Sequence, residues 1–368
     1  MDNILQNPDH RAQAAEKQLR SQRQIAYWLL IGVGMIIIQV LIGGITRLTE
    51  SGLSITEWKP ITGSLPPLNE AAWQLEFDKY KVTDQFKYVH QDFTLSEFKF
   101  IFFWEWFHRT WARLMGLVFL FGFIYFLVKK KFESRMIKPM IILFVLGGLQ
   151  GFIGWIMVKS GLVPEKYFVG HVELTTHFIA ALGLLSYTLW FALSLLVTEH
   201  QKVINTKLKN FLLLLLAVLF LQLVYGAFMA GLRAAITAST WPDINGSMFP
   251  AAMNELSPFT KNLVANPITI HFIHRGLAYL LVVLIGMWWF KSRAIANQKL
   301  FNRLRLTVVL LVVLQVLLGI LTVLNATYPD RLVVLGVSHQ FIAMILLMVI
   351  VSLLFVVRKK ERYNFQAV

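Results

Sequence analysis

The chain of 368 residues contains no cysteine. This absence excludes disulfide bonds, zinc–thiolate centres, iron–sulfur clusters and catalysis by a thiol. Charged residues are also scarce: they make up 15% of the chain, whereas an average soluble domain has about 25%. Because 57% of the residues are hydrophobic and occur in long runs, the sequence predicts a protein that crosses a membrane several times.

Eight runs are long and apolar enough to span a bilayer, which takes about 20 helical residues. They cover residues 26–45, 98–128, 137–158, 172–197, 210–231, 267–290, 305–325 and 335–357. Residues 1–25 are predicted to be a short tail, because they contain acidic residues that a mitochondrial transit peptide lacks. The predicted fold class is therefore an all-α membrane protein with eight transmembrane helices.

Acidic residues are outnumbered, with 20 Asp and Glu against 35 Lys and Arg, a net charge of +15. The basic residues do not form the single patch expected of a nucleic-acid-binding face. They cluster before the first run and after every second run, as the positive-inside rule describes for cytoplasmic segments. Both termini are therefore predicted to be cytoplasmic, the loops at 46–97 and 232–266 to lie outside, and no nucleic acid to be bound.

Gln and Gly, separated by three residues, recur in the odd-numbered runs. The four copies are QVLIG (39–43), QGFIG (150–154), QLVYG (222–226) and QVLLG (315–319). Small residues allow helices to approach closely, and Gln can hydrogen-bond between helices. These pairs are therefore interpreted as packing residues that mark a repeat.

The even-numbered runs repeat as well. EWFHR (105–109) matches HFIHR (271–275), and HFIAA (177–181) matches HQFIAM (339–344) with one residue inserted. Because each unit has an even number of spans, its second copy keeps the same orientation. Residues 26–200 and 201–368 are thus predicted to form two four-helix bundles related as a parallel repeat.

Histidines gather at the outer ends of the even-numbered runs. The repeat makes His108 equivalent to His274, and His177 equivalent to His339. Two imidazoles on different helices of one bundle, at one depth, are the ligand set of a bis-histidine haem. Zinc is less favoured because neither half adds a third ligand, and copper stays open although Met-rich ligand sets are absent. A lone interfacial histidine would be an ordinary hydrogen-bonding residue.

The other histidines fit this pattern less well. His10, His90 and His200 lie in the tail or in loops and carry no signal. His171 lies six residues before His177, about 240° round a helix, so both cannot face one iron.

Three residues before the shared His-Arg pair, the first half has Glu105 where the second has His271. Residues at this spacing share a helix face, so Glu105 can face the same space as His108. It could then handle protons or stabilise a cationic intermediate. The alternative is structural: a salt bridge to Arg109 within the helix. The difference suggests that one half performs chemistry and the other carries electrons.

Six stretches of the chain form a recognisable set: GGITRLTESGLSITEWKPITGSLPP (43–67), TLSEFKFIFFWEWFHRTWARLMG (94–116), GLQGFIGWIMVKSGL (148–162), TWPDINGSMFP (240–250), HFIHRGLAY (271–279) and SHQ (338–340). With these motifs the chain resembles the haem A synthase family, of the cysteine-free type, over nearly its whole length. The resemblance implies oxidation of the C8 methyl of haem O to a formyl group, giving haem A for terminal oxidases.

The resemblance also implies roles for individual residues. His274 and His339 would bind the iron of a resident haem b, the cofactor, while His108 and His177 would hold the substrate haem. Glu105 matches the family's Glu-x-x-His position and would be the catalytic carboxylate. The family's Tyr-Arg-Leu stretch before the fourth-span histidine is replaced here by GHVELTTH (170–177).

Propionate groups need cations near the outer surface. With the family's arginine missing, Arg47 and Arg113 are the candidate propionate contacts, and Arg109, Arg233 and Arg275 are further cations near the outer ends of the runs.

Haem O synthase and a membrane electron donor are the expected partners, in the cytoplasmic membrane of a bacterium, with the haem sites near its outer face. Two other classes of function remain open at this stage. A dihaem b cytochrome in quinol-linked electron transfer explains the paired histidines but gives Glu105 no task. A transporter built from repeats explains an intramembrane carboxylate but not the histidine pairs.

Overall fold

The computed structural model describes residues 8–57, 62–295 and 297–358. Eight helices in these ranges are long and apolar enough to cross a membrane. They are α1 (Pro8–Leu48), α4 (Leu95–Val128), α5 (Ser134–Gly161), α6 (His171–Leu196), α7 (Thr206–Gly231), α10 (Pro267–Lys291), α11 (Lys299–Leu324) and α12 (Pro329–Val356). The predicted all-α membrane class and the eight predicted spans are confirmed.

Three helices begin at least six residues earlier than the apolar runs predict. Helix α1 begins at Pro8 rather than near residue 26, because the residues between are mostly Ala, Glu, Gln, Lys and Arg, which are strong helix formers. Helix α11 begins at Lys299 and α12 at Pro329. Proline is well suited to the first turn of a helix, where its missing N–H would have no partner.

Capping residues fix the starts of the two helices that carry the His-Arg pairs. Thr94 and Glu97 form a capping box at the start of α4. The side chain of Asn266 accepts hydrogen bonds from Ile268 and Thr269 at the start of α10, whose first residue is Pro267. His274 therefore lies about two turns into α10, and His108 about three and a half turns into α4.

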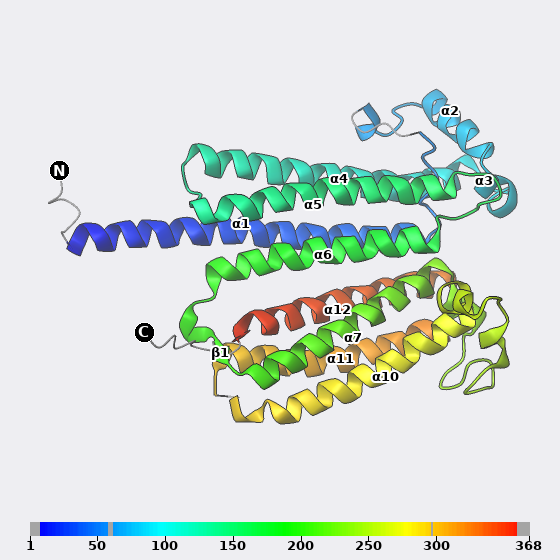
Figure 1. Cartoon of the computed structure of the whole chain (residues 1–368). Coiled ribbons are helices and arrows are strands. Elements are labelled where there is room, and N and C mark those ends of the chain that lie inside the picture. Colours follow the sequence, from blue (N-terminus) through cyan, green and yellow to red (C-terminus); the bar gives the residue numbers. More distant parts are fainter. Residues whose placement is uncertain (1–7, 58–61, 296, 359–368) are drawn as a thin grey trace.

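Helix contacts divide into two groups that meet along a shared face (Figure 1). Helix α1 packs on α4 and α6, and α5 packs on α6. Helix α7 packs on α10, and α11 packs on α10 and α12. The groups are joined by contacts of α1 with α12 and of α6 with α7 and α12. Among the spanning helices α12 is the most buried: 56% of its most apolar stretch lies inside the protein, against 6% for α4. The main hydrophobic core therefore lies where the two groups meet.

The two long loops form folded structure at one end of the helices (Figure 1). The first contains η1 (Thr62–Ser64), α2 (Glu70–Lys81) and α3 (Asp84–Val89), and an aromatic cluster centred on Tyr80 and Phe98 joins it to α4. The second contains α8 (Ala234–Thr237), η3 (Ala251–Asn254), η4 (Phe259–Lys261) and α9 (Asn262–Ala265).

The opposite end of the molecule carries η2 (Glu199–Gln201), η5 (Arg293–Ile295) and two short strands. Strands β1 (Val203–Ile204) and β2 (Val357–Arg358) pair in parallel, with Val203 opposite Val357.

Candidate functional site

A cavity of about 1170 Å³ lies between the helices and is lined by residues of all eight spans. Its volume exceeds that of most small-molecule pockets, which is about 300–1,000 Å³. The lining is mainly apolar side chains and glycines, with few polar groups. All seven predicted site residues line it: Arg47, Glu105, His108, Arg113, His177, His274 and His339. The chain thus brings together residues from the two halves of the sequence around one large apolar space.

The two histidines of the second half face each other. The ring centroids of His274 and His339 are 6.4 Å apart, with the ring planes inclined by 71°. The Nδ1 atom of each is buried and has no hydrogen-bond partner among the described residues. In the first half, His108 and His177 lie close enough for their charges to interact. Both pairs therefore offer imidazoles to the cavity from two different helices.

Glu105 is buried, with 3% of its surface exposed, and its carboxylate accepts three hydrogen bonds. Ser54 Oγ donates to Oε2 at 2.7 Å, and the backbone N–H of Ile55 donates to the same oxygen at 2.8 Å. Arg109 Nη2 donates to Oε1 at 2.5 Å. The salt bridge considered as an alternative from the sequence is therefore present, and the carboxylate also anchors the start of the first outer loop.

The arginine that follows each equivalent histidine binds an outer loop. Arg109 donates to the backbone carbonyls of Ile55 and Glu57. Arg275 donates to the carbonyls of Thr240, Pro242 and Asp243 in the second loop. These two cations therefore hold the loops against the helix ends in the two halves.

Arg47 joins the two groups of helices. Its Nη2 donates to the carbonyl oxygens of Ala230 and Gly231 at 2.6 and 3.1 Å. These carbonyls belong to the last turn of α7, where a helix has no acceptor partners of its own and favours a cation. Arg47 therefore lines the cavity while also capping a helix of the other group.

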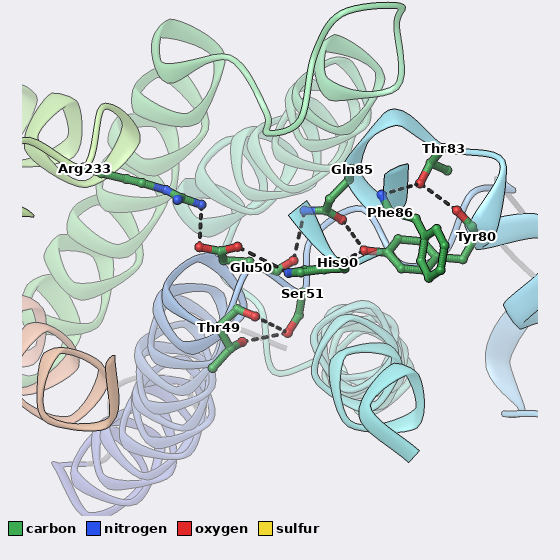
Figure 2. Close-up of polar contacts among 9 residues, drawn as sticks. All are labelled: Thr49, Glu50, Ser51, Tyr80, Thr83, Gln85, Phe86, His90 and Arg233. Atoms are coloured by element: carbon green, nitrogen blue, oxygen red, sulfur yellow. Dashed lines mark hydrogen bonds and ion pairs between the residues drawn. The ribbon is translucent and has the colours of Figure 1, made fainter. Parts of the chain in front are cut away.

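A second connection between the groups passes through Glu50 (Figure 2). Its Oε1 pairs with Arg233 Nη2 at 2.5 Å, and its Oε2 lies 3.3 Å from His90 Nε2. The Arg233 guanidinium also lies 3.7 Å from the ring centroid of Phe168. Because Glu50 and Arg233 both line the cavity, this ion pair forms part of its wall at the loop end.

His90 extends the same network into the first outer loop. Its Nδ1 lies 2.7 Å from the Tyr80 hydroxyl, which donates to Gln85 Oε1 at 2.9 Å (Figure 2). Burial, together with the nearby carboxylates of Glu105 and Glu50, raises the pKa of Tyr80, so this hydroxyl stays protonated. The sequence-based interpretation that His90 carries no signal was incomplete, because its burial depends on how the loop folds back.

We expect acid to weaken this network. Burial disfavours the Glu50 carboxylate, but its hydrogen bond to His90 and the charge of Arg233 outweigh that cost, so its pKa lies below the usual 4.5. A carboxyl with a lowered folded-state pKa stabilises the fold above the unfolded value and loses that contribution as the pH falls through the folded value. Glu50→Gln should therefore lower the free energy of unfolding by about 1–2 kcal/mol at pH 7. This value lies between the effect of losing an exposed ion pair and the effect of breaking a buried one.

Thermal unfolding of purified protein at pH 7 and near pH 3.5 measures this effect. The gap between wild type and Glu50→Gln should shrink at the lower pH. Glu57→Gln is the matched control, because Glu57 pairs with Lys79 at an exposed position in the same loop. An equal gap at both pH values would contradict the assignment.

Two further histidines have distinct environments. His171 Nε2 donates to the carbonyl of Val264 at 2.8 Å and the residue is not part of the cavity lining, so it joins α6 to the second loop. His271 is fully buried, lines the cavity and has no partner for either ring nitrogen within the described part of the chain.

Sequence reasoning underestimated the repeated glutamines. Gln39, Gln150, Gln222 and Gln315 each contact the ring of one cavity histidine, and each Gly of the repeat lies beside the same ring. The fixed four-residue spacing was the available signal, but it is equally typical of ordinary helix packing.

Comparison with known proteins agrees with the motifs. The COX15-CtaA family model, described as cytochrome oxidase assembly protein, matches residues 26–351. A heme A synthase of Flavobacterium johnsoniae is 40% identical over 332 residues, which is 89% of this chain and 96% of that protein. A heme A synthase of Rhodospirillum centenum is 38% identical over 352 residues, 95% of this chain and 92% of that protein.

The family match covers all eight spanning helices up to residue 351, and the relatives match over almost the whole of both chains. The paired histidines lie within the matched residues and line one cavity. The chain belongs to the COX15-CtaA family of cytochrome oxidase assembly proteins.

Proposed function

We propose that this chain is a haem A synthase that oxidises the C8 methyl of haem O to a formyl group. Relatives of about 40% identity carry the name heme A synthase. The observation that carries the proposal is the placement of two histidine pairs on one large apolar cavity. The same comparisons give no support to a dihaem cytochrome or a transporter.

We assign a resident haem b to His274 and His339. Two imidazoles that share one metal have ring centroids about 6 Å apart, because each metal–nitrogen bond is about 2 Å and each nitrogen lies about 1 Å from its ring centroid. The observed 6.4 Å separation fits this requirement. The unpartnered Nδ1 atoms and the apolar lining fit a flat, apolar macrocycle equally well.

We assign the substrate haem O to His108 and His177, on the same cavity but in the first half. Haem b, when bound by two histidines, supplies one-electron transfer. His108 and His177 would orient the substrate so that its methyl group lies near Glu105, and the apolar wall would exclude water. In the first half Arg113 also lines the cavity, and with Arg47 it is the proposed contact of the propionates.

Glu105 is the proposed catalytic carboxylate. All three of its contacts donate hydrogen bonds to it, one of them from the Arg109 guanidinium, so its oxygens are held in fixed directions. Of the two roles that the sequence left open, we therefore propose stabilisation of positive charge that develops on the substrate. An anion held in place before the reaction needs no reorganisation when that charge forms.

The repeat assigns different tasks to equivalent positions. We propose that residues 26–200 and 201–368 are two parallel four-helix bundles, the first for substrate and the second for haem b. The loop-binding roles of Arg109 and Arg275 support this equivalence. The sites would lie near the outer face of a bacterial cytoplasmic membrane, with both termini inside and with haem O synthase and an electron donor as partners.

Production of haem A tests the function. The chain is expressed with a haem O synthase in a host that makes no haem A, and the extracted haems are separated and identified. Haem A should form only when both proteins are present. Accumulation of haem O alone, with the chain folded in the membrane, would contradict the proposal.

A further inference from the structure

Four glutamines occupy equivalent places beside the four paired histidines of the cavity. The pairs lie on contacting helices: α1 with α4, α5 with α6, α7 with α10, and α11 with α12. The distances from Gln Nε2 to the nearest ring nitrogen are 3.0 Å for Gln39–His108, 3.1 Å for Gln150–His177, 3.4 Å for Gln222–His274 and 3.2 Å for Gln315–His339. Packing alone would not place the same amide on the same kind of ring four times.

The glycine of each repeat leaves room for the same ring. It follows its glutamine by four residues, about one helical turn, and so lies on the same helix face. A Cβ atom built at the glycine would lie 3.0 Å from His108 Cε1 at Gly43, 2.8 Å from His177 at Gly154, 3.1 Å from His274 at Gly226 and 2.9 Å from His339 at Gly319. A methyl group there would press on the imidazole edge. A glycine inside a helix costs about 1 kcal/mol relative to alanine, so close approach of the ring explains its presence.

The amides also have spare hydrogen-bonding capacity. The Oε1 atom of all four glutamines is buried without a partner among the described residues. An imidazole that gives one nitrogen to a metal carries its proton on the other, and that N–H needs an acceptor. The O and N ends of an amide are assigned from the hydrogen bonds around them. Rotation of an amide end would therefore turn an unpartnered oxygen toward the ring.

The two halves differ in what else the amide contacts. In the first half, Gln39 and Gln150 also donate to the backbone carbonyls of His108 and His177, at 3.1 and 3.0 Å. This second bond fixes the direction of the amide. For Gln222 and Gln315 the described side-chain contact is with the ring, and the backbone of each also lies beside the same ring. Their amide ends can therefore turn oxygen toward the ring.

We propose that each Gln-x-x-x-Gly segment is a cradle that positions one ligand imidazole. The glycine gives clearance to the ring in all four. The glutamine is the hydrogen-bond partner of the ring in the second half, and in the first half it holds the backbone of the ligand histidine. This inference rests on the proposed function, because it takes the four histidines as iron ligands. Gln222 and Gln315 position the ligands of the resident haem b. Gln39 and Gln150 position the ligands of the substrate.

Methionine variants test the glutamines. Gln222→Met and Gln315→Met keep the length of the side chain but remove its polar end. Loss of a partner of a metal-bound histidine typically lowers metal affinity about 10–100-fold. We expect the haem b affinity of the purified variants, measured by dilution, to fall at least tenfold. Alternatively, the ratio of the affinities for ferric and ferrous haem should change tenfold, which corresponds to about 59 mV in midpoint potential. Gln39→Met and Gln150→Met should leave that potential unchanged and weaken binding of added haem O.

Gln315→Glu covers the case in which a methionine variant does not fold. It keeps an acceptor beside the ring, which makes the ligand more basic and favours ferric iron, so the midpoint potential should fall. An unchanged midpoint potential in this variant would contradict the inference.

Alanine variants test the glycines against a matched control. Gly154→Ala should weaken binding of added haem O, whereas Gly183→Ala, on the helix that carries His177 but outside the cavity lining and with nothing within 4 Å of its added Cβ, should not. Gly319→Ala should disturb the haem b spectrum, and Gly286→Ala, also in open space, should not.

The haem content of the wild-type protein distinguishes a failure of the cradle inference from a failure of the proposed function. If the wild type binds haem b and its content and potential match those of Gln222→Met and Gln315→Met, the cradle inference is wrong and the proposed function stands. If the wild type binds no haem, both are wrong.

Discussion

Replacing His274 or His339 with Ala should remove most of the haem b from the purified protein. Each variant would leave the haem iron with one protein ligand and a gap in the cavity wall. Haem affinity should therefore fall at least about 100-fold, which is more than the usual effect of losing a residue that only hydrogen-bonds to a ligand. Haem content per polypeptide and the low-spin absorption bands measure this loss.

His108→Ala and His177→Ala are the matched comparisons, because they remove the proposed ligands of the first half. These variants should keep haem b and its bands but convert no haem O to haem A. His200→Ala, in a loop at the opposite end of the molecule, should change neither readout. If His108→Ala lost haem b while His274→Ala kept it, the assignment of the two halves would have to be reversed.

Glu105→Gln should reduce haem A formation by about 10²–10³-fold, the usual effect of removing one group that stabilises charge in a transition state. The amide keeps the size of the side chain and can still accept from Ser54 and Ile55. Haem b content should stay at the wild-type level, because Glu105 belongs to the first half. Haem A yield from membranes and haem b per polypeptide are measured together.

Ser54→Ala separates chemistry from loop anchoring. It removes one donor to Glu105 Oε2 but leaves the carboxylate charge and the Arg109 ion pair in place. Its haem A formation should fall less than about tenfold, in line with the net value of a single hydrogen bond. Equal loss in Ser54→Ala and Glu105→Gln would assign Glu105 to the loop rather than to the reaction, and normal yield in Glu105→Gln would exclude a chemical role.

The spanning helices could be predicted from sequence because a bilayer demands about 20 apolar residues for each crossing. Helix starts were less predictable. The polar beginning of α1 is helical because of its residue propensities, which an apolar window does not detect. The capping residues Thr94 and Asn266 were visible in the sequence but gained meaning only once the helices they begin were found to carry cavity histidines.

The candidate site could be predicted where the repeat compared residues with one another. His108 and His177 gained significance from His274 and His339, and all four line the cavity. Glu105 was distinguished by the same comparison, although its ion pair with Arg109 depends only on the four-residue helical spacing.

Loop contacts could not be predicted in the same way. Glu50 meets Arg233 across 183 positions of sequence and His90 across a folded loop, and neither pairing has a periodic signal. Arg47 contacts backbone carbonyls of α7, which any sequence would supply. These contacts follow from how the two groups of helices meet, and that arrangement is set by packing of the second half of α12, residues 343–356.

The absorption spectrum of the purified wild-type protein, reduced minus oxidised, is the most direct test of paired imidazoles holding a porphyrin iron. The sharp bands of low-spin haem b should be present and should vanish in the double variant His274→Ala with His339→Ala. A haem-free wild type after reconstitution, or low-spin bands that survive in the double variant, would contradict it.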